Sequence, residues 1–154
     1  MAVPKKDKIF VALQFLFFLA WMIPVEAWHF ELSNNLHGLA LITAGLGFLL
    51  VSIAFLQLNT NLSPFPSPKK GASLITGGVF AFARHPIYSG ILFMAFGLGF
   101  WLGSGYKLTM SLLLFLLFYL KSKYEEERLE EAFPEYPVYK RNTGRFFPKF
   151  RGRI

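Results

Sequence analysis

The chain contains no cysteine and few charged residues. Without cysteine it cannot form a disulfide scaffold, a thiolate metal site or a thiol nucleophile. Charged residues make up 16% of the 154 residues and hydrophobic residues 54%, which argues against a disordered chain. The three histidines are scattered, and neither a glycine-rich phosphate loop, a dinucleotide fingerprint nor a nucleophile elbow occurs. We therefore expect no metal site and no catalytic residue of the usual acid, base or nucleophile kind.

Long apolar runs are what the sequence has instead. A transmembrane helix needs about 20 mostly apolar residues, and residues 38–58 form such a run without a single charge. We predict an all-α integral membrane fold, one membrane domain over residues 1–154, with about four transmembrane helices. The expected helices span residues 9–25, 38–58, 86–103 and 106–122. The last two would form a helical hairpin, and a re-entrant hairpin that does not fully cross is the alternative.

The distribution of Lys and Arg predicts the orientation. Lysines precede the first apolar run, the loop over residues 26–36 has neither Lys nor Arg, and most remaining cations follow residue 59. Positive charge stays on the cytoplasmic side, so both termini should be cytoplasmic. A cleaved signal peptide is a poor alternative for the first run, because no A-x-A-like site follows it.

The segment that ends in Arg84-His85-Pro86 is the first candidate for a polar site. The residue before a proline is biased away from the α region, and proline fits the first turn of a helix. The third helix should therefore begin at Pro86. Its unpaired amides, from about Ile87 to Gly90, would favour an anion. A snorkelling arginine and a helix-capping histidine would explain the same residues equally well.

The segment over residues 123–154 is the second candidate. Six of the nine acidic residues lie between Glu125 and Glu135, either as a solvated helix face or as carboxylates that hold a cationic group. The closing stretch mixes Lys and Arg with Phe146, Phe147 and Phe150. Beside apolar helices this composition indicates an anchor on anionic membrane lipid rather than a nucleic-acid site.

Taken in order, these motifs resemble the isoprenylcysteine carboxyl methyltransferase and phospholipid N-methyltransferase superfamily. The resemblance covers about residues 62–150. The matching positions are Arg84, His85, Pro86, Tyr88 and Gly90, then Glu125, Glu126 and Leu129, then Phe133, Tyr136, Tyr139 and Pro148.

The resemblance implies an integral-membrane enzyme that uses S-adenosylmethionine, bound at the cytosolic face by residues 59–85 and 123–154, to methylate a lipophilic acceptor. The acceptor would be an isoprenylcysteine-like carboxylate or a lipid amine. By the same resemblance the cofactor residues would be Ser73, Leu74, Ile75, Phe80, His85, Pro86, Ile87, Tyr88 and Glu125. Lys121 would contact the acceptor, at a position where the methyl-esterifying branch usually has arginine.

Two other interpretations remain open. Membrane reductases of the sterol-reductase type share an Arg-His-Pro pattern and use NADPH, and Arg141 and Arg145 would suit its phosphates. The paired Glu125 and Glu126 favour the methyltransferase, because a phosphate site would not gather carboxylates. The second alternative is a non-catalytic membrane protein that retains the fold. The short chain favours a prokaryotic plasma membrane.

Overall fold

The computed structural model describes residues 3–26, 28–69 and 71–149; Lys70, Phe150 and residues 151–154, which belong to the predicted polar segments, lie outside the described residues. The elements are α1 (Lys5–Met22), α2 (Asn34–Leu58), the 3-10 helix η1 (Asn59–Asn61), α3 (Val79–Phe82), α4 (Pro86–Trp101), α5 (Gly105–Ala132) and α6 (Tyr136–Asn142). The described part of the chain forms no strand, only two isolated β-bridges. The fold class is therefore all-α, as predicted.

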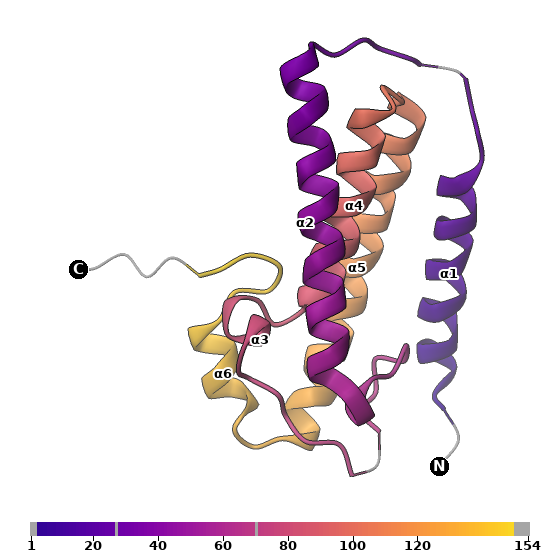
Figure 1. Cartoon of the computed structure of the whole chain (residues 1–154). Coiled ribbons are helices and arrows are strands. Elements are labelled where there is room, and N and C mark those ends of the chain that lie inside the picture. Colours follow the sequence, from indigo (N-terminus) through magenta and orange to yellow (C-terminus); the bar gives the residue numbers. More distant parts are fainter. Residues whose placement is uncertain (1–2, 27, 70, 150–154) are drawn as a thin grey trace.

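The long helices α1, α2, α4 and α5 run side by side, and the short elements gather at one end (Figure 1). α2 packs against α4, α4 against α5, and α1 against α5. The start of α1, the helices α3 and α6 and the polar end of α5 all lie at the same end of the bundle. Both segments that were predicted to form the polar site therefore meet there.

Small residues bring α2 and α4 into close contact. A Cβ added to Gly47 would lie 2.5 Å from the Gly90 carbonyl oxygen, and one added to Gly97 would lie 2.7 Å from the Ala40 carbonyl oxygen. Larger side chains would force these helices apart. The packing fixes the start of α4, which carries the candidate site.

We call residues 143–149, which follow α6, the C-terminal segment. A buried apolar cluster joins α4, α5 and this segment; it consists of Leu92, Ala95, Leu114, Leu117, Phe118 and Phe146. The Tyr88 ring stacks on Phe118 with centroids 4.5 Å apart. The apolar core thus extends up to the candidate site and supports the ring of one of its residues.

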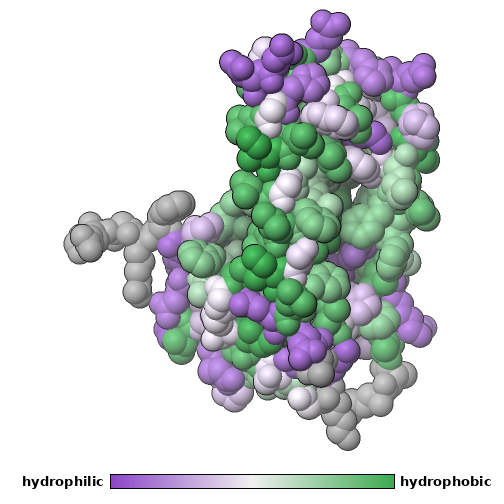
Figure 2. All heavy atoms as spheres, in the orientation of Figure 1, coloured by the Kyte–Doolittle hydropathy of each residue, from purple (hydrophilic) through white to green (hydrophobic). Residues whose placement is uncertain are grey.

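The outer surface of the bundle is apolar along its middle. Figure 2 shows a hydrophobic band between two more polar ends, and large side chains such as Leu19, Leu46 and Leu56 are exposed. Among the described helices, length and composition qualify only α2 as a transmembrane helix, and α4 is a shorter apolar helix. An exposed apolar band of this extent marks a surface that contacts a membrane or a partner.

Candidate cofactor site

The local backbone sets the start of α4 through His85. His85 has φ −124° and ψ 61°, and α4 begins at Pro86. One expectation about this turn is wrong: the Ser89 amide is not free, because it donates to the His85 carbonyl oxygen at 3.1 Å. That bond closes the first helical turn, so the amides left for an anion are those of Ile87 and Tyr88.

The C-terminal segment holds the same turn from the other side. The amides of Arg84 and His85 donate to the carbonyl oxygens of Gly144 and Arg145 at 2.9 and 3.0 Å. The Ser89 hydroxyl donates to the Phe146 carbonyl oxygen at 2.7 Å. These bonds join residues about 60 positions apart, so this turn is fixed only once the chain has folded back on itself.

Glu126 is the centre of a buried charge cluster. Its side chain is only 1% exposed. Arg84 donates to it at 2.7 Å and Arg145 at 2.9 Å, Lys140 lies 3.2 Å away, and the His85 Nε2 atom is also at 3.2 Å. Burial opposes ionisation of this carboxyl group, but the hydrogen bonds from His85, Arg145 and Arg84 outweigh burial and hold its pKa well below the usual range. We call Arg84, His85, Glu126, Lys140 and Arg145 the Glu126 cluster.

Beside this cluster lies a cavity of about 450 Å³. Pockets for small-molecule ligands span roughly 300–1,000 Å³. All the residues that the sequence assigned to cofactor or acceptor line it: Ser73, Leu74, Ile75, Phe80, His85, Pro86, Ile87, Tyr88, Lys121 and Glu125. They come from the loop after α2, from α3, from the start of α4 and from α5, so the fold brings both predicted segments to one space.

Glu125 is the acidic side chain that faces the cavity. It accepts a hydrogen bond from the Tyr88 hydroxyl at 2.8 Å, and its Oε2 atom is 3.8 Å from the His85 Nδ1 atom. The side chain of Glu125 is 24% exposed. The two rings beside it, those of His85 and Tyr88, stack in parallel with centroids 5.4 Å apart. The carboxylate is held in place but keeps room for a cationic ligand group.

Lys121 lies one helical turn before Glu125 and is almost completely buried. Its ammonium donates to the Gln14 side-chain oxygen at 2.6 Å and to the Pro64 carbonyl oxygen at 2.9 Å. Nearby, the buried Asp7 carboxylate accepts a hydrogen bond from the Ser67 amide at 3.0 Å. The buried charges of Lys121 and Asp7 thus hold the loop over residues 62–68 and α1 against α5.

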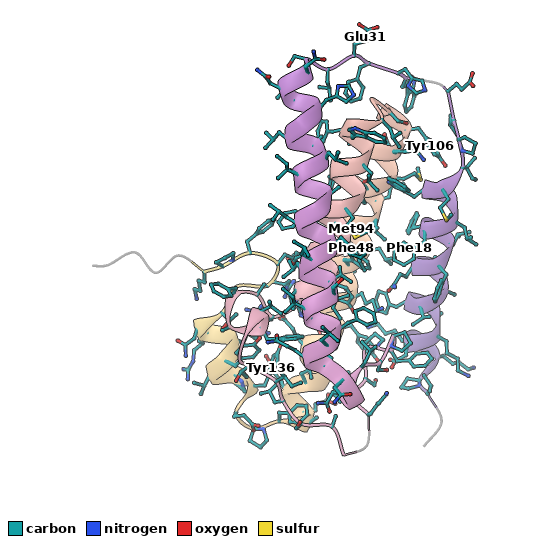
Figure 3. All side chains as sticks on the ribbon, in the orientation of Figure 1. Phe18, Glu31, Phe48, Met94, Tyr106 and Tyr136 are labelled. Carbon is teal, nitrogen blue, oxygen red and sulfur yellow. The ribbon has the colours of Figure 1, made fainter. Side chains whose placement is uncertain are left out.

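The cavity is polar at one end and apolar at the other. Its apolar lining includes Phe15 and Phe18 from α1, Phe55 and Leu58 from α2, and Ile91 from α4. Figure 3 shows Phe18 on the inner side of α1, toward the other long helices. Phe55 and Leu58 belong to the last turn of α2, at the end of the bundle that carries the polar segments. Phe15, Phe18 and Ile91 lie further along α1 and α4, so these side chains extend the cavity toward the apolar part of the bundle.

Helix α3 places Phe80, whose carbonyl oxygen accepts a hydrogen bond from the Tyr139 hydroxyl at 2.5 Å. Burial raises the pKa of Tyr139 to about 12, so this hydroxyl keeps its proton at neutral pH. Gly78 precedes α3 with φ 58°, and the Val79 amide donates to the Gln57 side chain at 3.1 Å. A Cβ at Gly78 would collide with that glutamine. Only glycine therefore suits this turn.

The sequence motifs did not indicate that Glu125 and Glu126 have different surroundings, nor that Asp7 and Gln14 take part in the site. Helical spacing could have predicted part of this difference. Lys121 and Glu125 are four residues apart and share one face of the helix, whereas Glu126 shares its face with the buried Ser122. The contacts of Asp7 with Ser67 and of Gln14 with Lys121 join distant parts of the chain, and one sequence does not reveal such pairs. No group of His, Asp and Glu that could hold a metal ion occurs among the described residues.

Comparison with known proteins identifies the family. A sequence model of the phospholipid methyltransferase family matches residues 34–136, and this chain belongs to that family. Over 84 residues it is 37% identical to the cobalt-zinc-cadmium resistance protein CzcN of Cupriavidus metallidurans, a match that covers 54% of this chain and 39% of that protein.

The fold is similar to that of a eukaryotic intramembrane Ras methyltransferase, isoprenylcysteine carboxyl methyltransferase. The TM-score is 0.68 at 23% sequence identity, over 96% of this chain and 54% of the other. The expected membership of this superfamily is thus confirmed. The chain spans 39% of the curated relative and 54% of the solved chain.

Proposed function

We propose that the protein is an integral-membrane methyltransferase that uses S-adenosylmethionine to methylate a lipophilic acceptor. The observation that carries this proposal is that every residue assigned to cofactor and acceptor lines one and the same cavity, which has both polar and aromatic walls. The chain's membership of the phospholipid methyltransferase family supports the same reaction.

The polar end suits the charged groups of the cofactor. The carboxylate of its amino-acid part would meet the Ile87 and Tyr88 amides at the start of α4, where the helix dipole favours an anion. The ammonium group would lie against Glu125, which the Tyr88 hydroxyl holds in place at 2.8 Å. Ser73, Leu74, Ile75 and Phe80 would contact the remaining part. The cofactor supplies an activated methyl group.

What the protein contributes to this transfer is orientation and exclusion of water. A carboxylate or tertiary amine already carries the lone pair that attacks, so no strong general base is needed. Phe15, Phe18 and Phe55 would admit the apolar part of the acceptor from the bilayer. Lys121 stands where the polar and apolar ends meet, and its ammonium would contact an acidic acceptor.

For this function the helices α1, α2, α4 and α5 would lie in the bilayer, with the cavity at the cytosolic face. The start of α1, which carries Lys5, Lys6 and Lys8, and the helix α6, which carries Lys140 and Arg141, lie at the cavity end of the bundle (Figure 1). Positive charge on the cytoplasmic side would then leave both termini in the cytoplasm. α4 has 16 residues, so it would reach the opposite face only with the loop that follows it.

NADPH fits the cavity less well. Arg141 and Arg145, the two cations that would suit its phosphates, do not line the cavity, whereas the carboxylate of Glu125 does. Arg145 is instead bound to Glu126 at 2.9 Å. The reductase interpretation therefore loses the residues that kept it open.

The proposal is tested by calorimetric titration. The detergent-purified protein is titrated with S-adenosylhomocysteine and, separately, with NADPH. We expect micromolar binding of S-adenosylhomocysteine alone. Binding of NADPH alone would indicate a reductase. If neither ligand binds, a non-catalytic member of the family is favoured. Methyl transfer to a farnesylated N-acetylcysteine and to a phosphatidyl-N,N-dimethylethanolamine, whose amine is tertiary, then separates the carboxylate acceptor from the lipid amine.

A further inference from the structure

A second hollow lies outside the cofactor cavity, on the outer side of the Glu126 cluster. It has a volume of about 440 Å³ and is lined by Arg84, Phe115, Tyr119, Arg145, Phe146 and Phe147. One wall comes from α5 and the other from the C-terminal segment. We call it the Arg145 groove. Arg84 lines both the Arg145 groove and the cofactor cavity, so this residue stands between them.

The guanidinium of Arg145 presents an unused edge in this groove. Its Nε and Nη2 atoms donate to the two oxygens of Glu126 at 3.2 and 2.9 Å. Its Nη1 atom has no hydrogen-bond partner among the described residues, and the group lies over the Tyr119 ring, 4.9 Å from the centroid. A guanidinium held on one edge and supported by a ring can bind two oxygens of an anion with its other edge.

The charge around the groove also favours an anion. Arg84, Lys140 and Arg145 surround the Glu126 carboxylate. Glu130 adds a second carboxylate, bound to Lys140 at 2.8 Å. Three cations against two carboxylates leave one positive charge uncompensated, and a bound phosphate would balance it.

The aromatic residues indicate that this anion carries an acyl chain. Tyr119 lies in the last turn of the fourth predicted membrane helix, and Phe115 lies one turn deeper. Phe147 is 58% exposed, and its ring is 5.9 Å from that of Phe93. A cation at the membrane interface with aromatic rings on its apolar side matches the order of headgroup and chain in a phospholipid.

We propose that the Arg145 groove binds an anionic phospholipid, with its phosphate on the free edge of Arg145 and an acyl chain along Phe115 and Phe147. This lipid is distinct from the methyl acceptor, which would occupy the cofactor cavity. By holding Arg145 against Glu126, the lipid also steadies Arg84 and His85, and through them the cavity. This last effect rests on the proposed function, whereas the lipid site rests only on the membrane location.

The lipid site is tested by titrating the purified protein in a nonionic detergent with short-chain phosphatidylglycerol and phosphatidylcholine. Both lipids carry a phosphate, but the choline of phosphatidylcholine adds a positive charge beside Arg84, Lys140 and Arg145. We therefore expect phosphatidylglycerol to bind about tenfold more tightly. Equal affinity for the two lipids would overturn the proposal. Inorganic phosphate should not compete at equal concentration, and full competition would mean an anion site without a lipid.

Arg145→Lys keeps the positive charge but loses the second edge, so we expect about a tenfold loss of phosphatidylglycerol affinity. Arg128→Lys is the matched control, because Arg128 also pairs with a carboxylate, at 2.7 Å from Glu131, and lies over the ring of Tyr124. Equal losses in both variants would show only diffuse attraction and would contradict a built site.

Tyr119→Leu provides a second test that keeps the ion pairs and hydrogen bonds of Glu126, none of which involves the Tyr119 side chain. It removes the ring under Arg145, so the preference for phosphatidylglycerol should fall severalfold while thermal unfolding stays near that of the wild type. An unchanged preference would overturn the groove as the binding site. Adding phosphatidylglycerol to the wild type should also tighten S-adenosylhomocysteine binding. If that ligand does not bind at all, the proposed function fails, while the lipid titrations still decide the groove.

Discussion

Glu125 and Glu126 are neighbours on α5, yet they face two different environments. Glu125 lines the cofactor cavity, is 24% exposed and accepts a hydrogen bond from Tyr88. Glu126 is buried, and Arg84, Arg145 and Lys140 surround it. The comparison teaches that one acidic motif serves two tasks: the first glutamate stays available to a ligand, and the second holds three segments of the chain together.

The difference follows from the turn of the helix. Successive residues of an α-helix point about 100° apart, so the two glutamates face different sides of the helix. The His85 ring lies between them, with its Nδ1 atom 3.8 Å from Glu125 and its Nε2 atom 3.2 Å from Glu126. Lys121 and Glu125 face the cavity, whereas Ser122 and Glu126 are completely buried. Figure 3 shows Tyr136 at this same end of the bundle, among the polar segments and far from Glu31.

The largest expected effect is on stability. Glu126→Gln removes the charge that balances Arg84 and Arg145, so the free energy of unfolding should fall by about 3–5 kcal/mol. Glu130→Gln is the matched control, because Glu130 pairs with Lys140 at 2.8 Å but is 39% exposed. Its effect should stay within about 0.5 kcal/mol. Thermal unfolding in detergent measures both, and equal effects would remove Glu126 from its central position.

The next largest effect is expected at Lys121 and separates acceptor turnover from cofactor affinity. Lys121→Met keeps the length of a side chain that is 1% exposed but removes its ammonium. Turnover of a farnesylated N-acetylcysteine should drop about tenfold or more, as expected for the loss of a charged contact. The affinity for S-adenosylhomocysteine should change much less. A change confined to the cofactor would exclude Lys121 from the acceptor site.

The buried glutamate, Glu126, should also make stability depend on pH. Because the pKa of Glu126 is lowered in the folded state, its stabilising effect is complete above the unfolded pKa of about 4.3 and is lost as the pH falls below that value. In that range one carboxylate adds a slope of about 1.4 kcal/mol per pH unit.

Denaturant unfolding at several pH values below about 4.3 measures this slope. Glu126→Gln should show a shallower slope than the wild type, because it removes the carboxyl group whose pKa is lowered. An unchanged slope in this variant would mean that the lowered pKa does not belong to Glu126.

The smallest effect concerns the wall of the cavity. Tyr139→Phe removes the hydrogen bond from the Tyr139 hydroxyl to the Phe80 carbonyl oxygen, so stability should fall by about 1 kcal/mol. Because Phe80 lines the cavity, the affinity for S-adenosylhomocysteine should also fall slightly. Val138→Ala, at an exposed position of the same helix, is the control and should leave both quantities unchanged.

The sequence predicted the helical fold and the family because both depend on local patterns. Apolar runs indicate helices, and Pro86 indicates the start of α4, where the structure begins that helix. The Glu126 cluster could not be predicted, since it depends on Gly144 and Arg145 returning to Arg84 and His85. Nor does a single sequence show that Lys121 binds Gln14 on α1.

The central claim is that Glu125 binds the ammonium group of the cofactor, and a thermodynamic cycle tests it most directly. The affinities of S-adenosylhomocysteine and of its analogue without the amino group are measured for the wild type and for Glu125→Gln. We predict that the substitution weakens S-adenosylhomocysteine binding about tenfold and leaves the binding of the analogue unchanged. An equal loss for both ligands would contradict the assignment of Glu125.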